Sequence, residues 1–294
     1  MQATLCLQRC SHLKDVQKYH TSVPVRGIKA PWCARPETIY RGVKVSSSSS
    51  NSGVQGAHAQ GLRLPDLDHT YETMVSFTEY ANWLVPGALM TGRYPFVEPS
   101  RCTSRNVGEE QLERIISHGI KTFVSLQGEL PHQKDMPLKG VDGFQGYKAP
   151  ATLIAAALSD PPTVEEMNGL RTPYLDKFLP PKKNAPKTSR RMIELEFLHY
   201  PIVDLSVPTM GLLDEIVNST IERIQGGDVM YLHCWGGRGR AGTVGACVVG
   251  KMYDLSAEEA LERVQRAFDT RNDGGRKSPE TEEQLKLVKE YLSS

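Results

Sequence analysis

A glycine-rich segment of the chain reads His233-Cys234-Trp235-Gly236-Gly237-Arg238-Gly239-Arg240. The apolar run 229–232 precedes it, and small and β-branched residues over 243–252 follow it. This order predicts a buried strand, a tight loop and a closely packed helix. Glycines let successive backbone N–H groups turn inward, and a helix N-terminus adds partial positive charge. The loop is therefore predicted to bind an anion with three equatorial oxygens, such as a phosphoryl group.

Two side chains of this loop are predicted to carry its chemistry. The positive field favours the thiolate form of Cys234, which is the form that attacks phosphorus. The planar guanidinium of Arg240 can donate two parallel hydrogen bonds to phosphoryl oxygens. The residues between them are predicted to bind substrate: Trp235, Gly236, Gly237, Arg238 and Gly239. This displacement needs no metal ion and no cofactor, and a Walker-type nucleotide loop is excluded because it requires Gly-Lys-Ser/Thr.

The spacing of the loop resembles the HCxxGxxR signature of the protein tyrosine and dual-specificity phosphatase superfamily. The nearest likeness is to the small dual-specificity branch, near the cyclin-dependent kinase-associated phosphatases, and it covers about residues 80–127 and 192–292. It implies an α/β fold with a central, mostly parallel sheet flanked by helices. It also implies hydrolysis of phosphate monoesters through a phosphocysteine, with His233 supporting the backbone around Cys234.

A second motif, His199-Tyr200-Pro201-Ile202-Val203-Asp204, places Asp204 thirty residues before Cys234. Members of the branch carry a general-acid Asp at a similar spacing, so the resemblance implies this role for Asp204. A mobile loop bounded by proline can deliver such an acid to the leaving group. Asp214, within a predicted helix, is the alternative acid.

Ala241 departs from the family pattern, which has Ser or Thr directly after the Arg. That hydroxyl stabilises the sulfur when water cleaves the phosphocysteine, and Thr243 is predicted to point elsewhere. Three functions therefore stay open: a protein tyrosine or dual-specificity phosphatase, a phosphoinositide or carbohydrate phosphatase, and a phosphate-binding pseudophosphatase with slow turnover. The expected partner is a phosphorylated protein or a small phosphorylated ligand.

Apolar periodicity predicts the other elements of the domain. Strands are predicted at 83–85, 88–90, 120–126, 195–200 and 229–232, with helices at 108–118, 210–224 and 243–252. Two further helices are predicted after caps at Ser256 and Ser278. Residues 131–190, rich in Pro, Gly and Lys, are predicted to form a loop-rich insertion with short helices at 153–158 and 163–170.

The overall charge is nearly balanced, with 35 basic and 34 acidic residues, which argues against a nucleic-acid binder. Residues 1–60 differ, since they hold eight Lys or Arg and only two acids. We expect residues 1–70 to be a disordered, Ser-rich leader, with a transit peptide as the alternative, ahead of a catalytic domain over 71–294.

The six cysteines lack disulfide or zinc spacing, which favours a reducing compartment. This indicates the cytoplasm, or a plastid or mitochondrion if the leader is a transit peptide. No apolar run reaches the roughly 18 residues of a membrane span. The sequence indicates no oligomeric state.

Overall fold

A five-stranded sheet lies at the centre of the computed structural model, which describes residues 67, 77, 79–159 and 193–293. In chain order, its strands are β1 (Ala81–Val85), β2 (Leu89–Gly92), β3 (Thr122–Gln127), β4 (Glu196–Ile202) and β5 (Met230–His233). The spatial order is β1-β2-β5-β3-β4; β1 and β2 are antiparallel, and the other neighbours are parallel. This is the mostly parallel α/β class that the sequence predicts.

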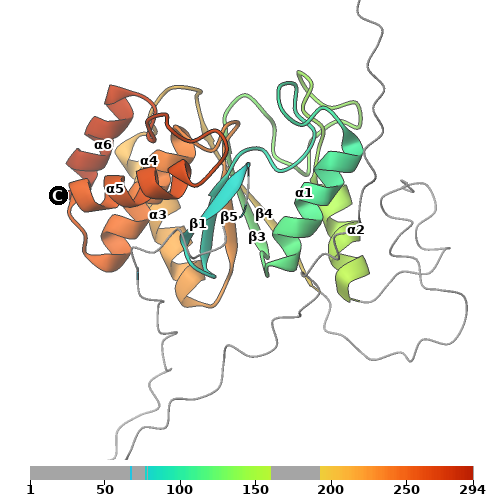
Figure 1. Cartoon of the computed structure of the whole chain (residues 1–294), viewed down its shortest axis with the longest axis horizontal. Helices are drawn as coiled ribbons and strands as arrows, with labels where there is room; N and C mark the ends of the chain where they lie inside the picture. Colours follow the sequence, from blue (N-terminus) through green and yellow to red (C-terminus); the bar gives the residue numbers. More distant parts are fainter. Residues whose placement is uncertain (1–66, 68–76, 78, 160–192, 294) are drawn as a thin grey trace, which may run out of the picture. The chain divides into compact units, whose positions relative to one another are not determined.

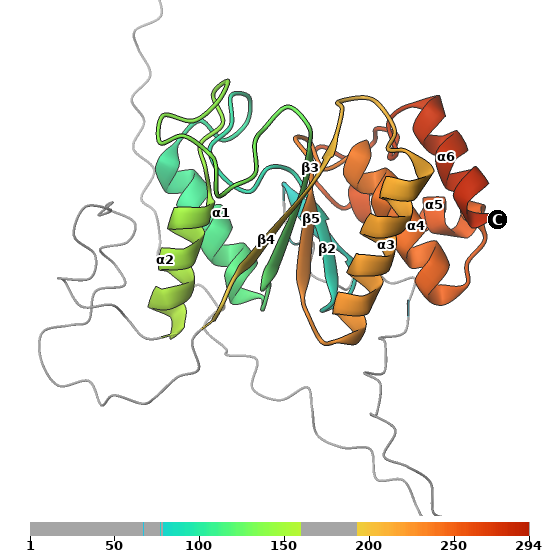
Figure 2. The same cartoon turned by 180° about the vertical axis from the view of Figure 1, so that it is seen from behind.

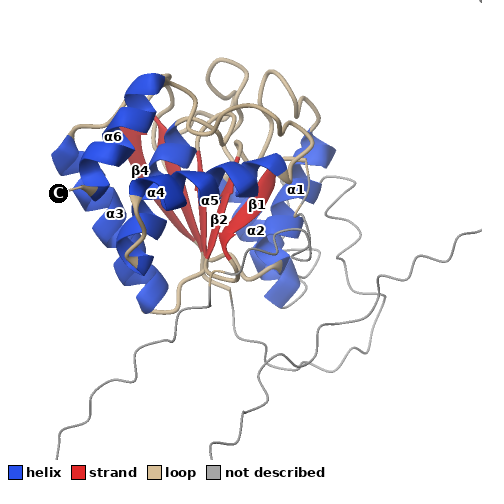
Figure 3. Ribbon diagram, turned by 60° about the vertical axis from the view of Figure 1, so that its left-hand side comes forward, coloured by secondary structure: helices blue, strands red, loops and turns tan. Residues whose placement is uncertain are grey.

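Helices of the described part cover both faces of the sheet (Figures 1 and 2). On one face lie α1 (Arg105–Ser117) and α2 (Lys148–Ser159). The other face is covered by α3 (Met210–Gln225), α4 (Arg240–Tyr253), α5 (Ala257–Asp269) and α6 (Glu282–Leu292). Figure 3 shows the strands as one layer with helices on either side.

Strand β5 contributes to the hydrophobic core on both faces of the sheet. Its four residues are all buried. Met230 and Leu232 pack in the cluster that includes α3, α4 and α5, whereas Tyr231 packs in the cluster that includes α1 and α2. This alternation follows from the two-residue period of a strand, and it explains why the run 229–232 is apolar throughout.

The close packing predicted for α4 is confirmed. Every residue from Arg240 to Gly250 is buried. A Cβ atom at Gly245 would lie 2.7 Å from Cδ2 of Leu84 on β1, which leaves no room for a side chain. The small residues therefore let α4 approach the sheet closely and place its N-terminus at the end of β5.

The start of α6 corrects one prediction. Its N-cap is Thr281, which forms a capping box with Gln284. Ser278, the predicted cap, instead donates a hydrogen bond from Oγ to the carbonyl oxygen of Arg238 at 2.9 Å. Thr281 is preferred because the side chain of Gln284, three residues later, accepts a hydrogen bond from the backbone N–H of Thr281. The cap predicted at Ser256 is confirmed, again as a capping box.

The predicted insertion contains more helix than expected, since α2 begins at Lys148 and ends at Ser159. The short helix predicted at 163–170 lies outside the described residues. So does the predicted leader over 1–70, except for Leu67. Among the described residues, no helix has the length and apolar character needed to cross a membrane.

Candidate active site

Functional side chains from three neighbouring parallel strands meet at one edge of the sheet. Cys234 directly follows β5, Glu129 lies two residues after β3, and Asp204 lies two residues after β4. Because β3 lies between β5 and β4, the three loops are neighbours. Ligands of open α/β sheets bind at this carboxyl edge. A cleft of about 270 Å³ lies here, lined in part by Cys234, Asp204 and Arg240.

The loop from Cys234 to Arg240 depends on a glycine at its turn. Gly237 has a φ of 67°, in the left-handed region that favours glycine. A Cβ atom here would lie 2.2 Å from the carbonyl carbon of Gly92. The Gly237 N–H donates to Sγ of Cys234 at 3.2 Å, and α4 begins at Arg240. A backbone donor and the N-terminus of a helix thus lie on the side of the loop that holds the sulfur.

Arg240 is held by two carboxylates, and its side chain is only 1% exposed. Nη1 and Nη2 donate to the two carboxylate oxygens of Glu129 at 2.6 and 2.9 Å. Nη1 also donates to the carbonyl oxygen of Ile202 at 3.0 Å, and Nη2 lies 2.7 Å from Oδ1 of Asp204. Nε is buried without a hydrogen-bond partner among the described residues. Nε therefore has one hydrogen bond left to donate, on a residue that lines the cleft.

Glu129 is a site residue that the sequence analysis missed. Burial raises the pKa of Glu129, but the hydrogen bonds from Arg240, the backbone and Gln127, together with the charge of Arg240, lower the pKa overall. For Arg240, burial lowers the pKa, because it disfavours the charged guanidinium. Glu129, Cys234 and Asp204 together outweigh burial and raise the pKa above its ordinary value. Both partners of the bidentate pair therefore stay charged, which fixes the guanidinium plane. The sequence signal for Glu129 is weak, because only its place after a predicted strand distinguishes it.

The two candidate acids lie in different surroundings. Asp204 lines the cleft and faces Arg240, with half of its side chain exposed. Asp214 lies on α3, where Oδ1 accepts a hydrogen bond from the Tyr291 hydroxyl at 2.8 Å and lies 3.6 Å from Lys251 Nζ. It does not line the cleft. Of the two, only Asp204 is placed to reach a group bound over the loop.

His233 is buried beneath the loop as a neutral ring. Burial lowers its pKa to about 3. Nδ1 lies 3.3 Å from the carbonyl oxygen of Cys234, and Nε2 lies 2.8 Å from the Tyr147 hydroxyl. Because a carbonyl only accepts hydrogen bonds, Nδ1 carries the proton and Nε2 accepts from Tyr147. The ring thus holds the backbone of Cys234, the supporting position that the family resemblance implies.

Trp235 links the loop to the segment before α1. Its Nε1 donates to Oε2 of Glu98 at 2.9 Å. The Glu98 carboxylate is buried and also accepts from the backbone N–H groups of Ser100 and Cys102, at 3.0 and 3.1 Å, and of Arg101. One buried carboxylate therefore joins two sides of the cleft.

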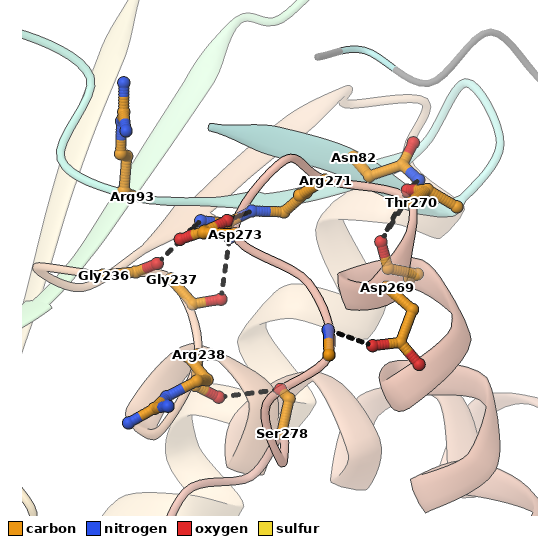
Figure 4. Close-up of polar contacts among 12 residues, drawn as sticks. Asn82, Arg93, Gly236, Gly237, Arg238, Asp269, Thr270, Arg271, Asp273 and Ser278 are labelled. Carbon is orange, nitrogen blue, oxygen red and sulfur yellow. Dashed lines mark hydrogen bonds and ion pairs between the residues drawn. The ribbon is translucent and has the colours of Figure 1, made fainter. Parts of the chain in front are cut away.

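A buried arginine just after α5 supports the loop from behind (Figure 4). Arg271 donates from Nη1 to the carbonyl of Gly237 at 3.2 Å and from Nη2 to that of Gly236 at 2.9 Å. Asp273 pairs with its Nε at 2.9 Å. In a trans peptide the N–H points away from the C=O. Arg271 thus directs the N–H groups of Gly237 and Arg238 away from itself, and the first of these meets the cysteine sulfur.

Arg271→Lys is expected to weaken oxyanion binding by about tenfold, the worth of one charge-assisted hydrogen bond. A lysine is a point charge that cannot hold two carbonyls in one plane. The measurement is inhibition by vanadate, alongside thermal unfolding. Arg263→Lys is the matched control, because Arg263 is a buried α5 arginine that donates from Nε and Nη2 to the Leu84 carbonyl, at 3.1 Å each. Both variants should lose stability; equal loss of vanadate affinity in both would contradict the assignment.

Arg238 has a partner within the protein. Its Nη2 forms an ion pair with Glu280, and its carbonyl accepts from Ser278 (Figure 4). Burial first, and then the nearby charges of Arg276 and Arg101, lower the pKa of Arg238. In this conformation the charge of Arg238 is offset by Glu280 rather than free for a substrate.

Ala241 leaves the sulfur without a hydroxyl donor from the start of α4. Ala241 is fully buried. The Thr243 hydroxyl donates to the carbonyl oxygen of Gly239 at 2.9 Å, so the prediction that it points elsewhere is confirmed. Among the described residues, the hydrogen bond to Cys234 Sγ comes from a backbone N–H.

Comparison with known proteins bears on this site. A family model described as "PTP-SAK: Swiss Army Knife protein, DSP-PTPase phosphatase domain" matches residues 153–284. This match and the loop signature support an assignment of the matched segment to the superfamily of cysteine-based protein tyrosine and dual-specificity phosphatases. The matched domain supports a cysteine-based phosphatase. The comparison with curated proteins finds no match.

Solved structures similar to the chain include Tk-PTP in the active form, at 23% identity over 73% of this chain and 97% of that one, with a TM-score of 0.40. PTPMT1 in complex with PI(5)P is 15% identical over 73% and 96%, with a TM-score of 0.40. Kinase associated phosphatase (KAP) with a Ser in place of its catalytic Cys is 16% identical over 73% and 93%, with a TM-score of 0.42. Likenesses at these scores carry no information on substrate.

Proposed function

We propose that this domain hydrolyses phosphate monoesters on proteins, at phosphotyrosine with or without phosphoserine and phosphothreonine, through a phosphocysteine. The thiolate of Cys234 attacks phosphorus, so that an S–P bond forms while the P–O bond to the leaving group breaks. Arg240 and the loop N–H groups bind the phosphoryl oxygens as charge shifts in the transition state. Asp204 donates its proton to the leaving oxygen.

Water completes the reaction in a second step. The water attacks phosphorus, and Asp204, now a carboxylate, accepts a proton from this water. A new O–P bond forms, the S–P bond breaks, and its electron pair returns to the sulfur of Cys234. The observation that carries the proposal is one cleft in which a backbone N–H reaches Sγ and Arg240 keeps a buried, unpartnered Nε.

The contact between Asp204 and Arg240 suggests how substrate entry prepares the acid. Oδ1 of Asp204 lies 2.7 Å from Nη2 of Arg240. A bound phosphoryl group competes for the same guanidinium, because it is an anion with several acceptor oxygens. The half-exposed Asp204 carboxyl is then released from Arg240 toward the leaving group.

Support for protein substrates comes from the resemblance of the loop and the acid spacing to the dual-specificity branch. A phosphoinositide or carbohydrate phosphatase is the second candidate, favoured by Arg101 and Arg276, which add positive charge to the cleft. The test is phosphate release from an aryl phosphate, phosphotyrosyl and phosphothreonyl peptides, a phosphoinositide and a sugar phosphate. We expect phosphate to be released faster from the phosphopeptides than from the phosphoinositide or the sugar phosphate. Phosphate release from the lipid or the sugar alone would contradict the assignment of protein substrates.

Ala241→Ser is expected to raise the steady rate by roughly tenfold, a modest fraction of the ~10²–10³ in rate that one donor aimed at a developing charge is typically worth. The native protein should release a burst of one leaving group per site from an aryl phosphate and then turn over slowly. Cleavage of the S–P bond suffers most without the hydroxyl, since the loop amides and helix N-terminus already assist the attack.

Rapid mixing measures the burst. Thr243→Ser is the matched control, since it keeps a hydroxyl on the same helix in contact with a loop carbonyl and should leave the burst unchanged. The absence of a burst in the native protein, together with no gain in Ala241→Ser, would show that another group already stabilises the departing sulfur.

A further inference from the structure

The cleft over the loop contains more positive charge than the proposed chemistry uses. Four arginines line it: Arg101, Arg238, Arg240 and Arg276. Two of them are paired, Arg238 with Glu280 and Arg240 with Glu129 and Asp204. The guanidinium groups of Arg101 and Arg276 form no hydrogen bond or ion pair with any described residue.

The acids of the cleft cannot neutralise these two arginines, because each already has a partner. Among the described residues, the acidic side chains that line the cleft pair as follows: Asp204 with Arg240, Asp273 with Arg271, and Glu280 with Arg238. Arg101 and Arg276 therefore leave two positive charges unmatched. Their influence reaches Arg238, whose pKa is lowered first by burial and then by these two charges.

Arg101 is held over the loop by its backbone. Glu98 accepts hydrogen bonds from the N–H groups of Arg101 and its neighbours, and the same carboxylate binds Trp235 of the loop. A Cβ atom at Gly236 would lie 3.7 Å from Nη1 of Arg101. The guanidinium therefore lies against the loop, although the residue as a whole is exposed.

Arg276 approaches from the segment between α5 and α6, which is also fixed. Its carbonyl accepts from Nε2 of Gln265 at 2.8 Å. The N–H of the preceding Gly275 donates to Oδ1 of Asp269 at 3.0 Å (Figure 4). Arg276 itself is exposed. Two anchored backbones thus present two unpartnered guanidinium groups at the rim of one cleft.

We propose that Arg101 and Arg276 form a second anion subsite, which binds a second phosphate on a residue next to the scissile one. This inference rests on the proposed function, and it makes a doubly phosphorylated peptide the preferred substrate. The floor of the cleft offers no spare cation, because Glu280 offsets Arg238. The spare cations are exposed at the rim, on the side of the cleft where an extended peptide bound at the loop would place its neighbouring residue.

The test compares kcat/KM for two peptides that differ only at the residue beside the scissile phosphotyrosine, phosphoserine in one and alanine in the other. The native protein should prefer the doubly phosphorylated peptide by about tenfold, the worth of one charge-assisted hydrogen bond. The Arg101→Gln, Arg276→Gln double variant should reduce this ratio to near one. The ratio is taken within each protein, so a general loss of activity cancels.

Lys277→Gln is the matched control. It removes the same charge one residue from Arg276, but Lys277 pairs with Glu282 at 3.2 Å and does not line the cleft. It should keep the native ratio. The preference of the native protein for the doubly phosphorylated peptide should also decrease as the salt concentration rises, because salt weakens interactions between exposed charges.

Other outcomes separate the two proposals. If the native protein releases phosphate from an aryl phosphate but has the same kcat/KM for both peptides, the subsite is overturned and the proposed function stands. No release from any substrate overturns the proposed function itself. A preference for an inositol bisphosphate over its monophosphate that depends on Arg101 and Arg276, without a peptide preference, overturns the peptide as the occupant.

Discussion

Cys234→Ser is expected to abolish hydrolysis, by roughly 10⁴–10⁶ in kcat, and to leave a folded protein that still binds oxyanions. A serine hydroxyl is a far weaker nucleophile than a thiolate at neutral pH when no base lies beside it. The anion-binding parts of the loop are backbone N–H groups and Arg240, which the substitution does not remove. The measurements are phosphate release from an aryl phosphate and binding of inorganic phosphate by calorimetry.

Cys247→Ser is the control for this prediction. Cys247 is a buried thiol on α4, and burial raises its pKa to about 12, so it does not ionise near neutral pH. We expect Cys247→Ser to lose some stability and to keep most of its activity. Near-native activity in Cys234→Ser would remove Cys234 as the nucleophile.

Asp204→Ala is expected to lower kcat by about 10²–10⁴, the usual worth of general acid catalysis. The loss should be largest for phosphopeptides, whose leaving oxygens need a proton. It should shrink for aryl phosphates with strongly acidic leaving groups. A plot of log kcat/KM, which reports the step in which the leaving group departs, against the pKa of the leaving group should therefore be steeper in Asp204→Ala than in the native protein.

Asp214→Ala is the control for the acid, because Asp214 lies on α3 against Tyr291 and outside the cleft. It should keep the native slope. If Asp204→Ala were harmless on a phosphopeptide while Asp214→Ala was not, the acid would be Asp214, and the spacing argument would be wrong.

The sequence predicts those parts of the site that are local along the chain. The strand, loop and helix around Cys234 follow from a continuous pattern of apolar residues and glycines. Helix α4 nevertheless begins at Arg240, three residues before its predicted start. Ala241 and Gly242 have no strong helical periodicity, but both are buried, and packing decides their conformation. Asp204, which lines the cleft, is predicted from the family resemblance of its spacing to Cys234, and its role as the acid stays a prediction.

The supporting residues could not be predicted, because they reach the loop across long stretches of chain. Glu129 contacts Arg240 from 111 residues away, and Arg271 binds carbonyls 34 and 35 residues before it. No short motif marks either residue. Their roles depend on which strand ends are neighbours in the sheet, and this follows from strand order rather than from local pattern.

The most direct test of the account is to look for the phosphocysteine. The native protein is mixed rapidly with an aryl phosphate that carries a labelled phosphoryl group, quenched in denaturant and digested. The account predicts label on the peptide that contains Cys234, approaching one per active site, and none in Cys234→Ser. Label on another residue, or rapid hydrolysis with no labelled protein at any time, would contradict it.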